Sequence, residues 1–515
     1  MENVATINIT GGIMMKKLLV VAMALAMVIA LAACGDSKKE SNSGKDKLTV
    51  GQTWVINDDN PLDGGNPWSI TAHGISEYVY TIQPDGTLDS RYVKELKQVD
   101  DLNWEGVMKE DAKFSDGSDV KAEDLCKCLN TVIEKNEMST ASAGKIEYTP
   151  TGEYTFTAKT ERPTKVLPSI LAEWTNVVFK EDNGKYIFTG PFVIKDLKPG
   201  AELVLEPNKN YPDSDKRPKE VVIKAFKDVN ALKLAMQSDE LDLAFGLTGE
   251  VAKQLKDDGK NVIDFPAGYQ YYTFLNMSNE ALSKEQVRKA LDEGINRKEL
   301  IKALNGGKEP TGLFAGYNSF NAKSKTKFDP ENAAKYLDEA GYTMQSGGKY
   351  RKNANGEELK LDITTYSSKA DLPIIAQVLV SEFEKLGIKS EVKVVDNIDE
   401  VADAGNYDVL LYAQHPSPTG DAGYFLNQFF RTDGPKNRMK YSSSEVDSLL
   451  DKLGTVSDKS ERDKLSVEIQ QKVINDRPVI MTVDPEWHAA VSDKLKDYKL
   501  WNGDYFIVNP TLMIK

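Results

Sequence analysis

Cysteine and histidine are scarce in this sequence, because a chain of 515 residues contains only three of each. So few imidazoles leave little material for general acid–base catalysis, which uses histidine more often than any other residue. Cys126 and Cys128 lie two positions apart in a helical pattern, so they point to different faces and a disulfide between them is not expected. Without further cysteines or a nearby histidine, they also make a poor zinc site. We interpret both as helix-packing residues, with free-thiol reactivity as the alternative.

Signatures of several enzyme classes are also missing. The sequence contains no G-x-S-x-G nucleophile motif, no G-x-x-x-x-G-K-[ST] phosphate loop and no H-E-x-x-H metalloprotease motif. Catalysis would therefore depend on carboxylates that nothing in the sequence distinguishes from the others. We predict a binding protein that is not an enzyme and that has no cofactor of its own.

Positive charge is in deficit. The chain carries 65 Lys and Arg residues against 79 Asp and Glu, for a formal net charge of −14, and it has no basic stripe of the kind that follows a phosphate backbone. Nucleic acid is therefore not an expected partner. Hydrophobic residues at 40% and charged residues at 28% are typical of a soluble globular protein, and the length allows two or three domain-sized cores.

The longest hydrophobic run lies near the amino terminus. Lys16 and Lys17 precede an apolar stretch over residues 18–31, which is shorter than the roughly 20 residues that a membrane-spanning helix needs. Small residues then lead into Cys34, the layout of a secretory signal. The sequence LAAC at residues 31–34 resembles the lipobox of bacterial lipoproteins, whose cysteine is lipidated when the signal is removed. An uncleaved membrane anchor is the alternative.

The segments on either side of this run fit an exported protein. Residues 34–47 predict a flexible lipidated tether, because they are polar and contain no apolar residue after the cysteine. Residues 1–33 are the expected signal peptide. Residues 1–13 are interpreted as the product of an upstream start codon chosen in error, with translation beginning at Met14 or Met15. Acyl chains at the mature terminus would anchor the protein durably to the membrane, which places it outside the cytoplasm.

Helical and strand patterns alternate along the rest of the chain. The apolar spacing over residues 70–80 predicts a helix face, and Pro199-Gly200 predicts the turn of a hairpin. Residues 359–413 read as strand, helix, strand and strand, which indicates a parallel-leaning α/β unit. The predicted fold class is therefore α/β.

Several segments, in order along the chain, resemble one known family. It is the extracytoplasmic solute-binding proteins of ABC importers, family 5, the cluster of oligopeptide, dipeptide and nickel-chelate binders. One signature is Phe114-Ser115-Asp116-Gly117, and another is Thr189-Gly190-Pro191-Phe192. The matching segments are residues 114–124, 189–192, 230–246, 287–301, 329–342 and 461–480. Their glycines and prolines fix turns, so they indicate the fold and not the ligand.

The resemblance implies a two-lobed periplasmic-binding-protein-like fold of type II with an extra inserted domain. Its lobes would close by hinge motion on a ligand in a central cleft. It also implies a monomer that serves the permease subunits of an ABC importer. The implied parts are lobe I over 48–86, 181–268 and 488–515, an inserted subdomain over 87–180, and lobe II over 269–487.

His73, His415 and His488 are the candidate metal ligands. The resemblance places all three at the cleft, and in nickel-chelate binders a cleft histidine completes the coordination of the metal. Three converging imidazoles would suit nickel or another borderline metal. No local pattern such as an i, i+4 pair supports ligation, so packing or surface roles are the alternative for each histidine.

A peptide ligand makes different demands, above all a carboxylate for its ammonium group. The resemblance implies an aspartate in the loop after residues 407–413, but Gln414 and His415 occupy that place. Asp421 is the candidate substitute, with a role in a structural segment of the family as the alternative. This departure weakens the case for a peptide.

Aromatic residues are candidates for the cleft wall. Trp174 is placed to form such a wall, with a core role as the alternative. Tyr269 and Tyr271 lie at the implied hinge, where alternate residues of a strand face opposite sides, so one face would line the cleft. The case for a nickel chelate has its own departure, because the arginine that the resemblance implies for the chelator falls near Asn176.

The sequence therefore predicts a membrane-tethered receptor that captures a small solute and delivers it to an ABC permease. Peptide is the first choice of ligand, because it is the commonest in the family, and nickel or another metal chelate is the alternative. A sensory or adhesive lipoprotein that uses the same cleft is a more remote alternative. In each case the ligand must favour the closed form over the open form, since equal affinity for both would shift nothing.

Overall fold

The computed structural model describes residues 46–83, 87–495, 498–500 and 506–513. The predicted signal peptide and Cys34 lie outside these residues, as does nearly all of the predicted tether. Lys47–Lys515 forms one compact unit. Within the described residues, every helix is too short or too polar to cross a membrane.

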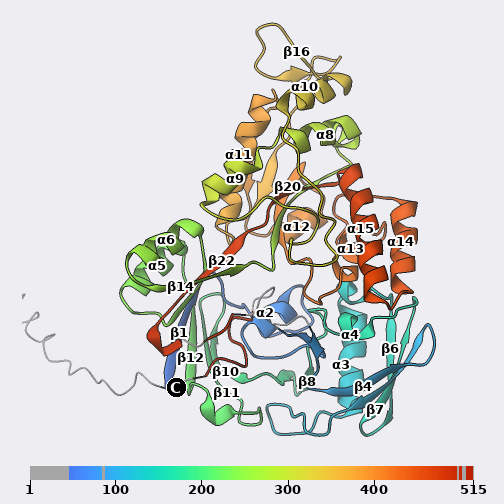
Figure 1. Ribbon diagram of the computed structural model, residues 1–515. Helices are drawn as coiled ribbons and strands as arrows, with labels where there is room; N and C mark the ends of the chain where they lie inside the picture. The colour runs from blue at the N-terminus through green and yellow to red at the C-terminus, as the bar shows by residue number, and fades with distance from the viewer. Residues whose placement is uncertain (1–45, 84–86, 496–497, 501–505, 514–515) are drawn as a thin grey trace, which may run out of the picture. The chain divides into compact units, whose positions relative to one another are not determined.

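A seven-stranded mixed sheet forms the first lobe (Figure 1), in the order β10-β11-β12-β1-β13-β22-β14. β1 pairs in parallel with β12 and β13, and the other neighbours are antiparallel. Helices α5 and α6 pack against it through an apolar cluster. The sheet therefore joins segments from the beginning, middle and end of the unit. Its elements are β1 (Lys47–Gln52), β10 (Phe192–Lys198), β11 (Glu202–Pro207), β12 (Glu220–Ala225), α5 (Val229–Gln237), β13 (Leu243–Leu247), α6 (Gly249–Asp257), β14 (Asn261–Pro266) and β22 (Glu486–Val491).

Two local expectations have different outcomes in this lobe. The hairpin predicted at Pro199-Gly200 is confirmed, because β10 and β11 pair antiparallel around it. The helix predicted over residues 70–80 is much shorter, since α2 spans Asn66–Ala72. Gly74 has a φ of +71°, and a Cβ there would lie 2.4 Å from the carbonyl oxygen of Val508. The chain therefore turns after α2 because a segment distant in sequence packs against it.

A five-stranded sheet forms the second lobe, in the order β19-β18-β20-β15-β21. β18 pairs in parallel with β19 and with β20, which confirms the α/β unit predicted over residues 359–413. Helices α8 to α11 cover one face and α12 to α15 the other (Figure 1). Its elements are β15 (Gln270–Leu275), α8 (Glu285–Gly294), α9 (Arg297–Leu304), α10 (Pro330–Glu339), β18 (Ile363–Thr365), α11 (Asp371–Lys385), β19 (Val392–Val394), α12 (Ile398–Asp403), β20 (Val409–Gln414), α13 (Gly423–Phe430), α14 (Ser444–Gly454), α15 (Lys459–Asp476) and β21 (Val479–Val483).

Burial on both faces of this sheet explains the composition of β15. All six of its residues are buried. Tyr271 and Leu275 belong to the core on one face, whereas Tyr272 and Phe274 belong to the core on the other. Successive strand residues point to opposite sides, so a central strand covered by helices on both faces needs apolar or aromatic residues at every position.

An antiparallel sheet with the order β4-β5-β7-β6 forms the inserted subdomain and packs under α3. Cys126 and Cys128 on α3 are buried and free, which confirms that they are packing residues. Its elements are β4 (Val93–Gln98), β5 (Asn103–Met108), α3 (Ala122–Lys135), β6 (Ile146–Gly152) and β7 (Thr155–Thr160). The short elements of the unit are β2 (Thr81–Ile82), β3 (Leu88–Asp89), α4 (Leu167–Ile170), β8 (Phe179–Asp182), β9 (Lys185–Phe188), α7 (Glu280–Ser283), β16 (Thr343–Met344) and β17 (Arg351–Lys352).

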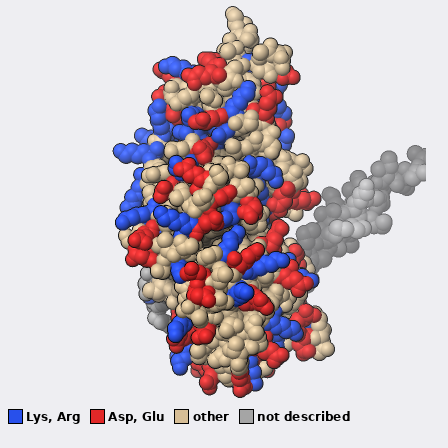
Figure 2. Space-filling model, turned by 90° about the vertical axis from the view of Figure 1, so that its right-hand side faces the viewer, with Lys and Arg blue, Asp and Glu red and all other residues tan. Residues whose placement is uncertain are grey.

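The chain passes between the two larger sheets twice, from β14 to β15 and from β21 to β22. The architecture is thus α/β with two lobes and a third sheet, while the residue boundaries of the lobes stay predictions. On the face shown in Figure 2, Lys and Arg side chains are interspersed with Asp and Glu, without a large patch of one sign.

Candidate functional site

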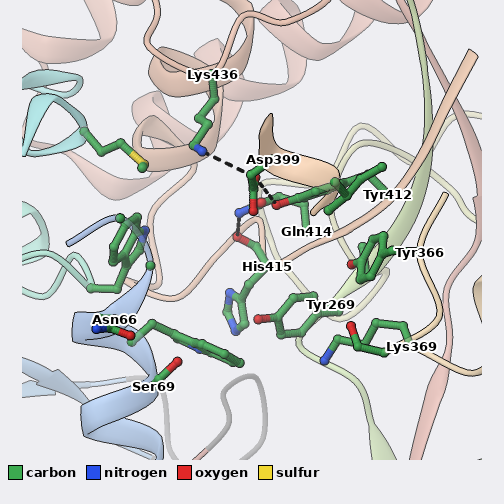
Figure 3. Close-up of a pocket in the computed structure, with 18 of the residues that line it drawn as sticks. Asn66, Ser69, Tyr269, Tyr366, Lys369, Asp399, Tyr412, Gln414, His415 and Lys436 are labelled. Carbon is green, nitrogen blue, oxygen red and sulfur yellow. Dashed lines mark hydrogen bonds and ion pairs between the residues drawn. The ribbon is translucent and has the colours of Figure 1, made fainter. Parts of the chain in front are cut away.

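A cavity of about 600 Å³ lies between the two lobes and the inserted subdomain (Figure 3). This volume falls within the roughly 300–1,000 Å³ that is usual for small-molecule sites. The first lobe contributes Trp54 and Trp68, and the segment that follows α4 contributes Trp174. The second lobe contributes residues after β18 and β20, among them Lys369 and His415.

Aromatic rings form a continuous wall in this cavity. Trp54, after β1, stacks on Trp68 of α2 with ring centroids 5.1 Å apart. Trp68 meets the edge of Tyr269 at 6.2 Å, and Tyr269 in turn meets the ring of His415 edge-on at 5.5 Å. Such rings favour flat or apolar groups and exclude water from the charged groups beside them.

The parallel pairing of β18 with β20 brings the polar residues of the second lobe together. Tyr366 and Lys369 follow the carboxyl end of β18, and His415 follows the carboxyl end of β20. Carboxyl ends of parallel neighbours meet at the same edge of a sheet, where α/β proteins bind ligands. The fold therefore positions an ammonium group and an imidazole on one side of the cavity.

His415 presents a buried imidazole to the cavity. Its side chain is 5% exposed, and neither ring nitrogen has a hydrogen-bond partner. Burial lowers the pKa of His415 to about 3, so the ring is neutral at physiological pH. The Gln414 side chain donates to the backbone oxygen of His415 at 3.0 Å and holds the loop. A neutral imidazole without a partner is suited to accept a proton donor or to bind a metal ion.

A compensated ion cluster closes one end of the cavity. Asp399 accepts hydrogen bonds from Arg438 at 2.6 Å and from the Tyr412 hydroxyl at 3.0 Å. The ammonium of Lys436 lies 3.7 Å from the same carboxylate. Burial acts to raise the pKa of Asp399, but Arg438 and Lys436 hold it below its ordinary value. This carboxylate is therefore ionised and occupied by its neighbours.

Lys369 lies on the opposite side, beside Tyr269. Its ammonium is 4.8 Å from the centre of the Tyr269 ring. Burial lowers the pKa of Lys369 to about 7, although the charge of Asp371 opposes this shift. Asp371 itself accepts a hydrogen bond from the Tyr271 hydroxyl at 2.9 Å. Lys369 therefore changes its charge close to neutral pH.

Five of the predicted site residues lie at or next to the cavity. Trp174, Tyr269, Gln414 and His415 line it, and their contact with a ligand stays a prediction. Tyr271 instead lines a crevice of about 40 Å³ next to the cavity.

The three histidines do not converge. His73 is fully buried under Trp54, with ring centroids 4.9 Å apart, and its Nε2 lies 2.7 Å from the side-chain nitrogen of Gln52. His488 on β22 places Nδ1 2.7 Å from Asp264 on the neighbouring strand β14. Within the described ranges, no group of three or more His, Cys, Asp and Glu side chains is placed to hold a metal ion. A shared site of all three histidines is therefore contradicted, and of the three only His415 lines the cavity.

Asp421 also lies outside the cavity wall. Its carboxylate accepts two hydrogen bonds from Arg462, at 2.9 Å from Nε and 2.7 Å from Nη2. An internal guanidinium therefore takes the place that a peptide ammonium was expected to fill. Asn176 is buried and donates to the backbone oxygen of Ile170 at 2.7 Å, so it is no substitute for an arginine at the ligand.

Sequence reasoning missed Trp54, Trp68, Lys369 and the charged pair Asp399 and Lys436. The available signal was their place in the loops after strands, since Trp54 follows β1 and Lys369 follows β18. Loops at the carboxyl ends of parallel strands carry ligand contacts in α/β proteins. The strand order that makes this signal useful was not evident from the sequence.

A family model described as bacterial extracellular solute-binding proteins, family 5, middle, matches residues 92–437. The chain belongs to this family. The nickel-binding protein NikA of Staphylococcus aureus is 26% identical over 492 residues, which cover 94% of this chain and 96% of that protein. The oligopeptide-binding protein AppA of Bacillus subtilis is 23% identical over 538 residues, with coverage of 94% and 96%.

Solved structures show the same fold. Staphylococcus aureus NikA in complex with Ni(L-His)2 has a TM-score of 0.81 at 24% identity and covers 91% of this chain and 100% of that one. Bacillus subtilis AppA in complex with a nonapeptide has a TM-score of 0.77 at 19% identity, with coverage of 89% and 97%. The predicted two-lobed α/β fold of type II is confirmed. Family 5 proteins are the substrate-binding components of ABC importers, so this chain is a binding protein and not an enzyme.

Proposed function

We propose that this protein is the lipid-anchored receptor of an ABC importer and that it captures a small metal chelate. On this proposal residues 1–33 are removed as a signal peptide, Cys34 carries the lipid, and the monomeric receptor closes over its ligand outside the cytoplasm. The closed form then delivers the ligand to the permease subunits. The observation that carries the proposal is the neutral, unpartnered imidazole of His415 in an aromatic cavity.

The surroundings of His415 favour a chelate over a bare metal ion. Imidazole suits nickel and other borderline metals, but a single histidine leaves most coordination positions open. The described residues offer no cluster of three protein ligands, so the remaining donors must arrive with the metal. A cavity of about 600 Å³ has room for a metal ion with organic chelators around it. The rings of Trp54 and Trp68 provide flat surfaces against which a chelator would pack.

The similarity to NikA of Staphylococcus aureus supports the same proposal. That protein is named for nickel, and one of its structures holds Ni(L-His)2. The nickel complex of L-histidine is therefore the first probe to offer to this protein.

His415→Ala tests the proposal directly. We expect the variant to lose affinity for the nickel complex of L-histidine by more than the roughly 10–100-fold that loss of an outer-shell partner costs a metal site. Calorimetry measures the affinity, and quenching of Trp54 and Trp68 fluorescence gives a second reading. The melting temperature of the empty variant should stay close to wild type, because the ring nitrogens of His415 make no hydrogen bond.

His488→Asn is the matched control for loss of a histidine. His488 lies outside the cavity, and asparagine retains a nitrogen donor for Asp264. The control should bind the complex as the wild type does. Equal nickel affinity in His415→Ala and wild type would refute the role of His415.

A peptide remains the second candidate, because the cavity wall carries both signs of charge. Exposed carboxylates of Asp63 and Asp396 share the wall with Lys369 and Lys436. Such an arrangement would suit the two charged ends of a short peptide. Native mass spectrometry of the protein as purified separates the two candidates, since a ladder of bound peptides favours one and stoichiometric nickel favours the other.

A further inference from the structure

Lys369 lies near His415, the proposed metal ligand, but it is not itself a proposed ligand of the metal. The ammonium nitrogen of Lys369 lies 4.8 Å from the centre of the Tyr269 ring. The ring of His415 contacts the same tyrosine, with the two ring centres 5.5 Å apart. Figure 3 shows Lys369 and His415 flanking Tyr269. A ligand that binds His415 and extends along the Tyr269 ring would therefore reach the ammonium of Lys369.

We propose that Lys369 binds a carboxylate of the chelator, so that the protein selects a metal complex of an amino acid over one of a simple amine. This inference rests on the proposed function and names its ligand class. An amino acid coordinates a metal through its amine nitrogen and one carboxylate oxygen. The second carboxylate oxygen stays outside the coordination sphere and accepts a charge-assisted hydrogen bond. Lys369 would supply that bond, because no arginine lines the described wall of the cavity.

The other charged groups around the cavity favour Lys369 for this task. Lys436 already lies 3.7 Å from Asp399, within the cluster that includes Arg438. The charge of Asp371 acts to raise the pKa of Lys369. Asp371 also accepts a hydrogen bond from the Tyr271 hydroxyl. An incoming carboxylate would add a second negative charge beside a partly buried ammonium, where an ion pair is stronger than in bulk water.

The protonation of Lys369 provides a signature that a merely structural lysine would lack. The groups that face Lys369 are Asp371 and Tyr271 on its own side and Glu486 on β22 across the small crevice. The charge of His488 in turn acts to lower the pKa of Asp371. Burial lowers the pKa of Lys369 to about 7 in the empty protein. A bound carboxylate raises this pKa, so binding above neutral pH takes up a proton. The affinity should therefore fall as the pH rises above 7.

The test compares two preformed nickel complexes, one with L-histidine and one with histamine. Histamine has the same amine and imidazole donors and lacks the carboxylate. We expect wild type to prefer the L-histidine complex, and Lys369→Met to lose affinity for it by about 30-fold or more, as for a desolvated charge pair that loses one partner. The affinity of Lys369→Met for the histamine complex should not fall, because this complex has no carboxylate for the lysine and its positive charge is repelled by the ammonium.

Lys369→Arg serves as the conservative control. Arginine keeps the positive charge at all accessible pH values, so it should keep the preference for L-histidine and lose the proton uptake. Calorimetry at about pH 8 in two buffers of different ionisation enthalpy measures that uptake. Close to one proton per complex is expected for wild type, and none for the arginine and methionine variants.

The outcomes separate this inference from the function on which it rests. If wild type binds neither nickel complex, the proposed function fails and this inference fails with it. If both complexes bind equally well and His415→Ala abolishes both, the function stands and the role of Lys369 is refuted. Unchanged selectivity in Lys369→Met, or equal proton uptake in that variant and wild type, would also refute it.

Discussion

Glu173 is a buried carboxyl group whose effect on stability depends on pH. Its side chain is 2% exposed and lies next to a small cavity between the inserted subdomain and the second lobe. One carboxyl oxygen accepts a hydrogen bond from the Ser142 hydroxyl, and the other has no partner. Burial, assisted by the charge of Asp421 and opposed by Ser142, raises the pKa of Glu173 to about 8.

The direction of the effect follows from proton binding. In the folded protein Glu173 is protonated at pH 7, whereas in the unfolded chain its pKa returns to the ordinary value of 4.5. The folded state therefore binds more protons, and its stability falls as the pH rises from about 4.5 to about 8. At about 1.36 kcal/mol per pKa unit, the loss is about 3 kcal/mol at pH 7 and about 5 kcal/mol above pH 8.

Glu173→Gln removes this titration and preserves the shape of the side chain. The amide oxygen can still accept the hydrogen bond from Ser142. We expect the free energy of unfolding of the variant, relative to wild type, to increase by about 4 kcal/mol between pH 4.5 and pH 8.5. Urea denaturation at a series of pH values measures this difference.

The change with pH is the decisive quantity, because any fixed cost of burying the amide is the same at every pH. Glu147→Gln on β6 is the control, since that glutamate is exposed on the same subdomain. Its difference from wild type should stay nearly constant across the series. A constant difference for Glu173→Gln as well would show that Glu173 is ionised in the folded protein and would refute the reasoning.

Two further predictions concern a buried guanidinium and the lipid anchor. Arg462→Ala should destabilise the protein by about 3–5 kcal/mol in urea denaturation, because it leaves the carboxylate of Asp421 without its partner in a largely buried position. A loss below about 1 kcal/mol would show that water replaces the guanidinium. Cys34→Ala should move the protein from the membrane fraction to the soluble fraction and remove the acyl mass from its amino terminus. Retention in the membrane would instead support an uncleaved apolar anchor over residues 18–31.

Much of the fold could be predicted because its signals are local. The turn at Pro199-Gly200 is encoded by two adjacent residues, and the α/β unit over residues 359–413 shows its strands as short alternating or apolar runs beside a helical pattern. The helix over residues 70–80 was wrong for a non-local reason. Its apolar residues are buried as the pattern predicts, but the turn at Gly74 packs against the carbonyl of Val508. No local pattern reports a contact between segments so far apart.

The candidate site was only partly predictable, because the direction of a side chain depends on strand pairing. His488 and His415 both belong to segments that the resemblance places at the cleft. The register of β22 turns His488 toward Asp264 of β14, whereas the loop after β20 turns His415 into the cavity. Lys369 joins His415 because β18 and β20 are parallel neighbours. The identity of these residues alone predicts neither the direction of each histidine nor the place of Lys369.

The distribution of the proposed contacts between the lobes bears on how binding would close the protein. His415 and Lys369 both belong to the second lobe, so a metal bond to one and an ion pair to the other would hold a ligand equally well in an open form. A ligand shifts an equilibrium only through contacts that differ between the two states. To reverse a 1:99 ratio it must favour the closed form by about 10⁴-fold. On this proposal that preference must come from the other side of the cavity, where Trp54 and Trp68 of the first lobe would pack against the chelator. The second lobe would then provide affinity and selectivity, and the tryptophans of the first lobe would convert binding into closure.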